Sequence, residues 1–331
     1  MSKVIITDYF KEAEIEKKIL GDNTEVICLS HENENNFPEI HEDAEVLLVW
    51  HKDISSAVIE KLKNCKAIIR YGVGYDNIDL IAAKKKNIQC ANTPDYGTSE
   101  VADTACALML SLIRKINYYN TSAKSYTSGW QVNVINENRI NPVKRLNEYK
   151  LGIIGFGRIG SAVAKRIQNF GVKVCYFDPY VKNPENSLNI NKVNSIEELL
   201  DFSNVISINC NLNNETKNLI NEEFINKMNE GTFLVNTARG QIISNLDCLV
   251  KGLEMNKLGA VGLDVLPEEP PKKNEKFIKA WKDDKHPLNK RILINPHSAY
   301  FSSRSVIEMR EKAANNALRA IRGQKVINQI N

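Results

Sequence analysis

The segment Gly155–Gly160 reads Gly-Phe-Gly-Arg-Ile-Gly, and this G-x-G-x-x-G spacing is typical of a loop that binds the pyrophosphate of a dinucleotide. Gly155 would permit the tight turn, Gly157 would let the main chain approach the phosphates, and Gly160 would let the helix pack closely on the strand. The phosphates would then meet the free N–H groups at the start of the helix. The pattern alone is weak, but a strand-like run precedes it and a helix-like segment follows it. This context favours a ligand site over a plain turn.

A second strand-like run, Val172–Phe177, ends in Asp178, which lies 18 residues after Gly160. A carboxylate at this position accepts hydrogen bonds from the adenosine ribose hydroxyls and repels the 2′-phosphate of NADP. The next residues are Pro179 and Tyr180, so no arginine follows that could hold such a phosphate. The sequence therefore predicts NAD, rather than NADP, as the cofactor.

Three further segments, each at the end of a strand-like run, carry side chains that could do chemistry. Asn236–Gly240 contains an arginine, Asp264–Pro270 contains carboxylates, and Asn295–Ala299 contains a histidine. Ligands bind at the carboxyl ends of strands in open α/β sheets. Taken singly, each residue has a plainer explanation as a surface charge, a loop residue or a structural histidine. Together they would provide an anion holder, a carboxylate and a general base.

Alternating strand-like and helix-like segments must position these residues. This alternation predicts parallel sheets covered by helices on both faces, and 331 residues correspond to two domains of about 150 residues each. The predicted fold class is therefore α/β, with two doubly wound parallel-sheet domains. The strand candidates are Val4–Thr7, Glu25–Leu29, Val46–Trp50, Ala67–Tyr71 and Ile88–Ala91 in the first half, and Leu151–Ile154, Val172–Phe177, Val205–Asn209, Thr232–Asn236, Ala260–Asp264 and Arg291–Asn295 in the second.

Two longer helices are also predicted. One starts near Thr98, where Thr98 or Ser99 can act as the N-cap, and runs beyond Ile116. The other runs from about Ser302 to Arg322 and forms the last element of the chain.

The composition excludes several classes of protein. The chain has 44 lysines and arginines against 40 aspartates and glutamates, and its net charge of +4 is too small for a nucleic-acid-binding surface. No apolar run reaches the length of a membrane span, and the first residues do not resemble a signal peptide. The seven cysteines are widely spaced and form no C-x-x-C pair, as expected for free thiols in a reducing compartment. We therefore expect a cytoplasmic protein that binds no metal, nucleic acid or membrane.

Six ordered motifs make the chain resemble the D-isomer-specific 2-hydroxyacid dehydrogenases over nearly its whole length. They are Arg70–Asp79, Asn92–Pro94 leading into Glu100–Asp103, the Gly155–Gly160 loop, Asn236–Gly240, Gly262–Val265 and Pro296-His297. Within the family, the chain is most similar to the branch of the C-terminal-binding proteins, the NAD-sensing transcriptional corepressors. This similarity is carried by Trp50-His51, Asp178–Tyr180 and Tyr300–Glu311. The family resemblance implies a flavodoxin-like substrate domain and a Rossmann NAD-binding domain.

The resemblance further implies a catalytic set of Arg239, Glu269 and His297. His297 would act as the general acid when a 2-oxo acid is reduced, and as the base in the reverse reaction. Glu269 would orient the imidazole and favour its charged form, although the neighbouring Glu268 is a rival on sequence alone. Arg239 would hold the substrate carboxylate or polarise its carbonyl group.

The resemblance also implies a set of residues that contact NAD. Asp264 would accept a hydrogen bond from the nicotinamide amide. The whole set is Val101, Gly155, Gly157, Arg158, Ile159, Gly160, Asp178, Cys210, Asn211, Thr216, Thr237, Ala238, Arg239 and Asp264.

The first domain is expected to bind the substrate. By resemblance, the main-chain N–H groups of the Val73-Gly74 turn would bind its carboxylate, and Arg70 would reach it from the preceding strand. His51 would line the site if the corepressor branch is the right comparison. Tyr300 stands where that branch usually has tryptophan, so a bulky hydrophobic acid is not the obvious substrate. The sequence favours a small acid without a phosphate group, because Arg70 alone supplies little positive charge.

The dinucleotide loop begins only at Gly155, so the nucleotide domain must lie inside the chain. The family pattern implies a discontinuous substrate domain, residues 1–123 with 296–331, and an NAD-binding domain of residues 124–295. Two chain crossings would form a hinge whose closure excludes water. The polar residues 125–148 resemble the family's dimer arm and predict a homodimer, although a plain linker is the alternative.

Two functions stay open on the sequence alone. The first is an NAD-dependent enzyme that interconverts a D-2-hydroxy acid and a 2-oxo acid, which the complete set of Arg239, Glu269 and His297 favours. The second is an NAD(H)-responsive binding protein with little turnover, like the corepressors. The chain ends eight residues after Gly323, without the long tail of animal corepressors, which counts against the second function.

Overall fold

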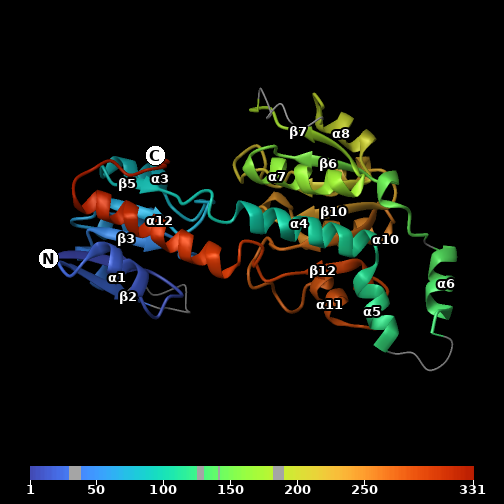
Figure 1. Ribbon diagram of the computed structural model, residues 1–331, viewed down its shortest axis with the longest axis horizontal. Helices are drawn as coiled ribbons and strands as arrows, with labels where there is room; N and C mark the ends of the chain where they lie inside the picture. The colour runs from blue at the N-terminus through green and yellow to red at the C-terminus, as the bar shows by residue number, and fades with distance from the viewer. Residues whose placement is uncertain (30–38, 125–129, 141, 182–189) are drawn as a thin grey trace. The chain divides into compact units, whose positions relative to one another are not determined.

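The computed structural model describes the chain except for residues 30–38, 125–129, 141 and 182–189 (Figure 1). The chain forms two compact units: unit 1 comprises Met1–Gly97 and Phe301–Asn331, and unit 2 comprises Thr98–Tyr300. Each unit contains a parallel sheet with helices, which confirms the predicted α/β class. The units divide at residues 97/98 and 300/301, whereas the sequence analysis placed the divisions at 123/124 and 295/296.

Unit 1 contains a five-stranded parallel sheet with the strand order β2-β1-β3-β4-β5. Its strands read as continuous apolar runs because both faces are covered. Alternate residues such as Ile5, Leu47 and Ile68 belong to a buried cluster on one face. The strand bounds are Ser2–Ile6 for β1, Thr24–Cys28 for β2, Val46–Val49 for β3, Ala67–Arg70 for β4 and Gln89–Ala91 for β5.

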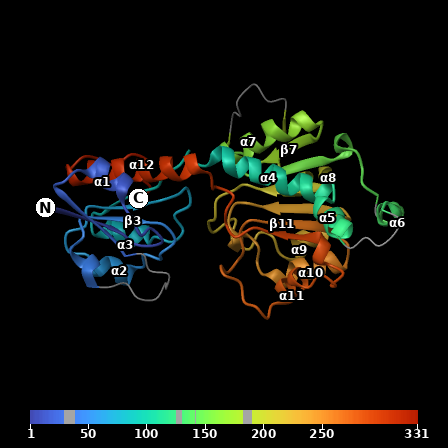
Figure 2. The same cartoon turned by 60° about the horizontal axis from the view of Figure 1, so that its bottom comes forward.

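Helices cover both faces of this sheet. Helix α1 (Glu14–Leu20) lies against α12 (Ser303–Ile321), and α12 packs on β3 and β4 (Figure 1). The predicted final helix is therefore confirmed, and the Ser302 side chain caps it by accepting a hydrogen bond from Ser305 N. Helices α2 (Ser56–Lys61) and α3 (Leu80–Lys85) pack together on the other face (Figure 2), and the 3₁₀-helix η1 spans Glu39–Asp43.

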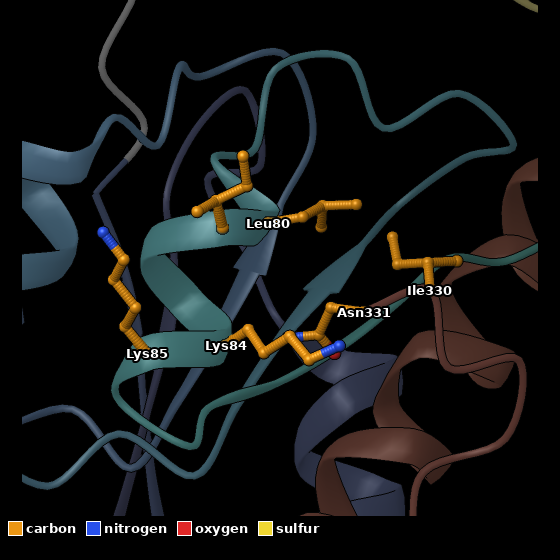
Figure 3. A pocket seen from close by; sticks show the side chains of 6 residues that line it. Leu80, Lys84, Lys85, Ile330 and Asn331 are labelled. Carbon is orange, nitrogen blue, oxygen red and sulfur yellow. The ribbon is translucent and has the colours of Figure 1, made fainter.

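The C-terminal residues cover the edge of strand β5. Gln329 forms an antiparallel bridge with Ala91, and Ile330 N donates to Cys90 O at 2.9 Å. A pocket of about 450 Å³ opens between this tail and α3 (Figure 3). Its lining residues are Leu80, Ile81, Lys84, Lys85, Ile330 and Asn331, none of which is a predicted site residue.

Unit 2 contains a seven-stranded parallel sheet with the order β12-β11-β10-β9-β6-β7-β8. Every neighbouring pair is parallel, so the connections must cross over the sheet through helices. The strand bounds are Lys150–Ile154 for β6, Lys173–Phe177 for β7, Asn191–Lys192 for β8, Val205–Ile208 for β9, Thr232–Asn236 for β10, Leu258–Leu263 for β11 and Ile292–Ile294 for β12.

Two buried clusters lie on opposite faces of this sheet (Figure 2). Helices α4 (Thr98–Ile113) and α7 (Arg158–Ile167) pack together on one face, and α4 also contacts β10 and β11. This packing buries the apolar side of α4 within unit 2, which is why unit 2 begins at Thr98. The helices of the other face are α8 (Ile196–Phe202), α9 (Glu222–Lys227), α10 (Leu246–Glu254) and α11 (Lys276–Lys282).

The remaining elements connect α4 to β6 or are short 3₁₀ turns. Within the predicted arm of residues 125–148, the structure contains α6 (Val132–Ile140) and η2 (Leu146–Glu148), while residues 125–129 and 141 lie outside the described part. Lys115 forms an ion pair with Glu137 of α6 at 2.6 Å. The other elements are α5 (Ile116–Lys124), η3 (Gln168–Phe170), η4 (Gly240–Ile242) and η5 (Asn289–Arg291).

None of the helices in the described part of the chain combines the length and the apolar character that crossing a membrane requires.

Candidate active site

The parallel strands of unit 2 bring all of its predicted site residues to one edge of the sheet. His297 follows β12, Asp264 follows β11, Arg239 follows β10, Cys210 follows β9, Gly155 follows β6 and Asp178 follows β7. Because these strands are neighbours in that order, the predicted catalytic residues lie at one end of the edge. The dinucleotide loop and Asp178 lie further along it. Strands β9 and β7 flank β6, so the loop sits at the switch point where such sheets bind ligands.

The Gly155–Gly160 loop joins β6 directly to α7. Gly155 has a φ of 88°, and an ideal Cβ at this position would lie 2.5 Å from Cys210 N, so no larger residue fits. An ideal Cβ at Gly157 would meet no atom within 4 Å. Helix α7 begins at the next residue, Arg158. Open space above a helix N-terminus fits a pyrophosphate group.

Asp178 is engaged in hydrogen bonds that shape this loop. Its Oδ2 accepts from Phe156 N at 2.8 Å, and its Oδ1 accepts from Tyr180 N at 2.8 Å and Val181 N at 3.1 Å. A carboxylate has about four lone-pair positions, so these three bonds leave room for about one more donor. Asp178 therefore ties the dinucleotide loop to the end of β7 and has less capacity for ribose hydroxyls than the sequence suggested.

Two buried oxygen atoms between these regions have no hydrogen-bond partner in the structure. They are Asn209 Oδ1 after β9 and Thr237 Oγ1 after β10, and Thr237 is only 7% exposed. Buried polar atoms are nearly always hydrogen-bonded, so two orphans on neighbouring strands indicate a polar ligand. This observation fits a dinucleotide lying along the edge. Thr237 was predicted from the sequence; Asn209 was missed, although its place directly after a buried strand could have signalled it.

The remaining predicted cofactor residues are divided between supporting and open positions. Thr216 Oγ1 donates to Asn211 O at 2.7 Å and accepts from Asn213 N, so it holds its own loop together. Burial raises the pKa of the Cys210 thiol to about 12, so this thiol stays neutral. Asn211 and Arg158 are exposed, whereas Val101, Ile159 and Ala238 are half-buried.

His297 and Glu269 form a contact at the end of the edge. His297 Nδ1 lies 2.8 Å from Glu269 Oε2, although 28 residues separate them. Glu269 Oε1 accepts from Leu266 N at 2.8 Å, which fixes the carboxylate within its loop. The rival Glu268 is exposed and pairs with Lys272 at 3.0 Å. The structure therefore brings Glu269, and not Glu268, to the histidine.

The turn that presents His297 is held by Asp264. His297 has a φ of 52°, in the left-handed region, and its N–H donates to Asp264 O at 2.8 Å. The Asp264 carboxylate accepts from Ser298 N at 2.9 Å and from Ala299 N at 3.0 Å. Burial raises the pKa of the Asp264 carboxyl, and these main-chain donors oppose that rise. Asp264 is 2% exposed, so its main visible task is to hold this turn.

Arg239 lies in a loop that packs tightly on the Glu269 loop. An ideal Cβ at Gly240 would lie 1.8 Å from Leu266 O, so glycine is required for this close approach. The buried Asn236 side chain accepts from Ala238 N and donates to Arg239 O, both at 2.9 Å. The loop that carries Arg239 is thus fixed beside the loop that carries Glu269.

Unit 1 places its predicted site residues at the carboxyl ends of three neighbouring strands, β3, β4 and β5. The turn at Val73 follows β4 and is anchored from the end of β5: Asn92 Nδ2 donates to Val73 O at 2.7 Å, and Thr93 Oγ1 accepts from Gly72 N at 2.6 Å. Val73 is 42% exposed, so the turn faces solvent in this unit. The sequence analysis assigned no role to these two anchors, although both directly follow a buried strand.

Arg70 and His51 take different positions from one another at this edge. Arg70 is only 6% exposed, and its Nη1 donates to Tyr71 O, beneath the turn. His51 is half-buried after β3, and its N–H donates to Asp8 Oδ2. In unit 2, the half-buried ring of Tyr300 lies 6.4 Å from that of His297, at an interplanar angle of 77°.

Comparison with known proteins agrees with these sites. A family model described as "D-isomer specific 2-hydroxyacid dehydrogenase, NAD binding domain" matches residues 106–299. A hydroxypyruvate reductase from Blautia hydrogenotrophica is 32% identical over 284 residues, covering 86% of this chain and 84% of the relative. A D-3-phosphoglycerate dehydrogenase from Methanocaldococcus jannaschii is 35% identical over 276 residues, covering 83% of this chain but 51% of the relative.

A solved structure gives the same result for the fold. The D-lactate dehydrogenase of Aquifex aeolicus, complexed with NAD and lactic acid, superposes with a TM-score of 0.79 and 27% identity, over 97% of this chain and 96% of that one. The family match, the identities above 30% and the dinucleotide edge of unit 2 point the same way. This chain belongs to the D-isomer-specific 2-hydroxyacid dehydrogenases and is an NAD-dependent oxidoreductase of that family.

Proposed function

We propose that this protein reduces a 2-oxo acid without a phosphate group to the D-2-hydroxy acid, and catalyses the reverse oxidation. The contact between His297 and Glu269, on the same sheet edge as the dinucleotide loop, carries this proposal. His297 would give a proton from Nε2, its other ring nitrogen, to the substrate carbonyl oxygen. In the oxidation it would take the proton back from the hydroxyl group.

Glu269 and Asp264 would act through His297. A carboxylate on Nδ1 fixes the direction of the ring and favours the imidazolium, which is the proton donor. Asp264 would set the turn from which the ring projects, through the bonds from Ser298 N and Ala299 N. Its predicted bond to the nicotinamide amide stays a prediction. Both carboxylates are thus proposed as positioning residues.

The guanidinium of Arg239 would bind the substrate carboxylate or carbonyl oxygen, because it stays charged and presents several donors. The N–H groups of the Val73-Gly74 turn would bind the carboxylate from unit 1. Arg70 would stiffen this turn through its bond to Tyr71 O, and its direct contact with substrate stays a prediction. His51 and Tyr300 are proposed to line the substrate.

The cofactor residues follow the order of the strands. The Gly155–Gly160 loop would hold the pyrophosphate, Asp178 would exclude a 2′-phosphate, and Thr237 would satisfy its buried hydroxyl on the nicotinamide half. NADH, when bound there, supplies the hydride. The other predicted cofactor contacts, including those of Val101, Cys210 and Asn211, stay proposals.

The relatives bear the names of a hydroxypyruvate reductase, a D-3-phosphoglycerate dehydrogenase and a D-lactate dehydrogenase. These names support an acid with a 2-oxo carboxylate and leave its distal part open. They give no support to the corepressor branch, so a partner-recruiting role stays a prediction. We also infer a homodimer formed through the arm, because Trp130, Val132 and Ile135 are at least half exposed there.

The test is NADH oxidation by the purified protein with a panel of 2-oxo acids: glyoxylate, pyruvate, hydroxypyruvate, 3-phosphohydroxypyruvate and phenylpyruvate. We expect turnover of an unphosphorylated acid, and a loss of kcat of at least about a hundredfold in His297→Ala, since general acid catalysis contributes about that much or more. The affinity for NADH should stay within about threefold. His286→Ala is the matched control, since His286 lies in a loop before Pro287. Tight NADH binding without turnover of any acid would refute the proposal and favour the binding-protein alternative.

A further inference from the structure

The chain makes an unusual turn directly after strand β1. Tyr9 has a φ of 64°, and Phe10 N donates to Asp8 O at 2.8 Å, as in a γ-turn. The form of this turn with positive φ is rare and strained, and a bulky residue in this region is an outlier. Such strain persists where surrounding contacts over-determine it, and it concentrates at functional sites.

Asp8 anchors the turn to the loop after β3. Asp8 is 3% exposed, and its carboxylate accepts from Trp50 N at 2.9 Å, from His51 N and from Lys52 N at 3.1 Å. A charged acceptor on three main-chain donors makes a strong connection. The position of the loop that carries His51 is therefore set by Asp8.

The rings of this region form a cluster, which we call the aromatic turn and define as Tyr9, Phe10, Trp50 and His51. The Tyr9 ring packs edge-on against Trp50 at 5.6 Å and against His51 at 5.3 Å. Phe10 stacks on Trp50 at 4.7 Å, and the Arg310 guanidinium lies 4.3 Å from the Phe10 ring. The cluster is thus braced from behind by α12, yet Tyr9 remains 56% exposed.

The aromatic turn lies beside the proposed carboxylate site. Strands β1, β3 and β4 are neighbours in the sheet, and Tyr9, His51 and Val73 follow their carboxyl ends in that order. An acid held by the Val73-Gly74 turn would therefore have the rings of Tyr9 and His51 on the same sheet edge. The Asp8 carboxylate is buried behind these rings, so the surface they offer is apolar and aromatic.

We propose that Tyr9 is a specificity-determining residue, and that with His51 it selects 2-oxo acids that carry an aromatic side chain. This inference rests on the proposed function and refines it. Aromatic rings pair edge-to-face with a gain beyond simple burial, and the exposed part of the Tyr9 ring offers such a partner. The sequence favoured a small acid because Tyr300 replaces a tryptophan. The aromatic turn, which no local pattern indicated, supplies another ring wall from unit 1.

The first experiment compares kcat/KM for phenylpyruvate and for pyruvate, measured by NADH oxidation with the full chain. We expect the wild type to prefer phenylpyruvate by at least about tenfold, the effect of one well-formed apolar contact region. In Tyr9→Gly this preference should fall about tenfold, through phenylpyruvate alone, while pyruvate changes less than about twofold. Glycine adopts a positive φ without strain, so this variant should fold at least as well as the wild type.

Two variants serve as controls. Tyr9→Phe keeps the ring and should keep the preference. Ile81→Ala removes an apolar side chain of unit 1 that is 72% exposed on α3, and it should change neither substrate. A preference that survives in Tyr9→Gly, or an equal loss for both acids, would overturn the specificity role of Tyr9.

The experiment separates this inference from the proposed function. Turnover of pyruvate with a wild-type preference for it over phenylpyruvate would refute the inference and leave the reductase proposal standing. Absence of turnover for every acid would refute the reductase proposal. In that case, calorimetric binding of phenylpyruvate to the wild type and to Tyr9→Gly decides the inference, since only a Tyr9-dependent affinity supports it.

Discussion

Individual residues at the unit 2 edge are held by the main chain more than by their neighbours' side chains. His297 projects from a left-handed turn whose three N–H groups bond Asp264, and Glu269 is fixed by Leu266 N. Such bonds cost little entropy when substrate arrives, because the geometry already exists before binding. This preorganisation is what a proton donor requires, since a displacement of about 1 Å can cost a hundredfold in rate.

The dinucleotide loop allows a prediction about one methyl group. Gly157→Ala places a Cβ where the structure has no atom within 4 Å, so the free energy of unfolding should change by less than about 1 kcal/mol. The same methyl group would occupy the space for the pyrophosphate, so we expect the Kd for NADH to rise at least about tenfold. Fluorescence titration with NADH and urea unfolding measure the two effects.

Gly155→Ala is the matched comparison in the same loop. Its Cβ would meet Cys210 N at 2.5 Å, and its φ of 88° disfavours alanine, so it should lose stability as well as cofactor affinity. Unchanged NADH affinity in Gly157→Ala would contradict the placement of the phosphates on this loop.

Among the elements of unit 1, a buried ion pair joins α1 to α12. Glu16 is fully buried and accepts from Arg310 Nε at 2.9 Å and Nη2 at 2.6 Å. The Tyr71 hydroxyl, at the end of β4, donates to Glu16 at 2.8 Å, and burial raises the pKa of that hydroxyl well above its usual range. The network therefore links two helices to the strand end that precedes the Val73-Gly74 turn.

Removing one partner of this pair should be costly. Arg310→Ala would leave the Glu16 carboxylate buried without its cation, and we expect unit 1 to lose about 3–5 kcal/mol of stability. Arg304→Ala on the same helix breaks an exposed pair with Glu308 and should cost less than about 1 kcal/mol. Urea unfolding followed by circular dichroism compares them, and equal losses would mean that the buried pair has no special weight.

How far each element could be predicted depends on how local its signal is. The loop from β6 to α7 was predicted correctly because glycine spacing, strand pattern and helix pattern lie within one short stretch. The strands were predicted for the same reason, and β8 was missed because Asn191-Lys192 carries no apolar signal. The first helix of unit 2 was predicted at its true start, Thr98, but its packing partners, α7 and β10, lie elsewhere in the chain.

At the scale of the whole molecule, the proposed dimer can be tested through the arm. Ile135 of α6 is 50% exposed, and a buried charge at a dimer interface is strongly unfavourable. We expect the wild type to sediment at twice its chain mass of 37.4 kDa, and Ile135→Glu to sediment at the chain mass. Ile81→Glu, on the exposed side of α3, should remain a dimer. A monomeric wild type, or a dimeric Ile135→Glu, would exclude this interface.

The sequence by itself determined the α/β class, the dinucleotide loop with Asp178, and the strand ends that carry Arg239 and His297. Each of these rests on residues close together in the chain, where periodicity and turn chemistry act directly. The tertiary structure decided which glutamate meets His297, that Asp264 holds its turn, and that Asp8 and Tyr9 build the aromatic turn. Those contacts join residues 28 to 44 positions apart, and only the packing of parallel strands brings them to one edge.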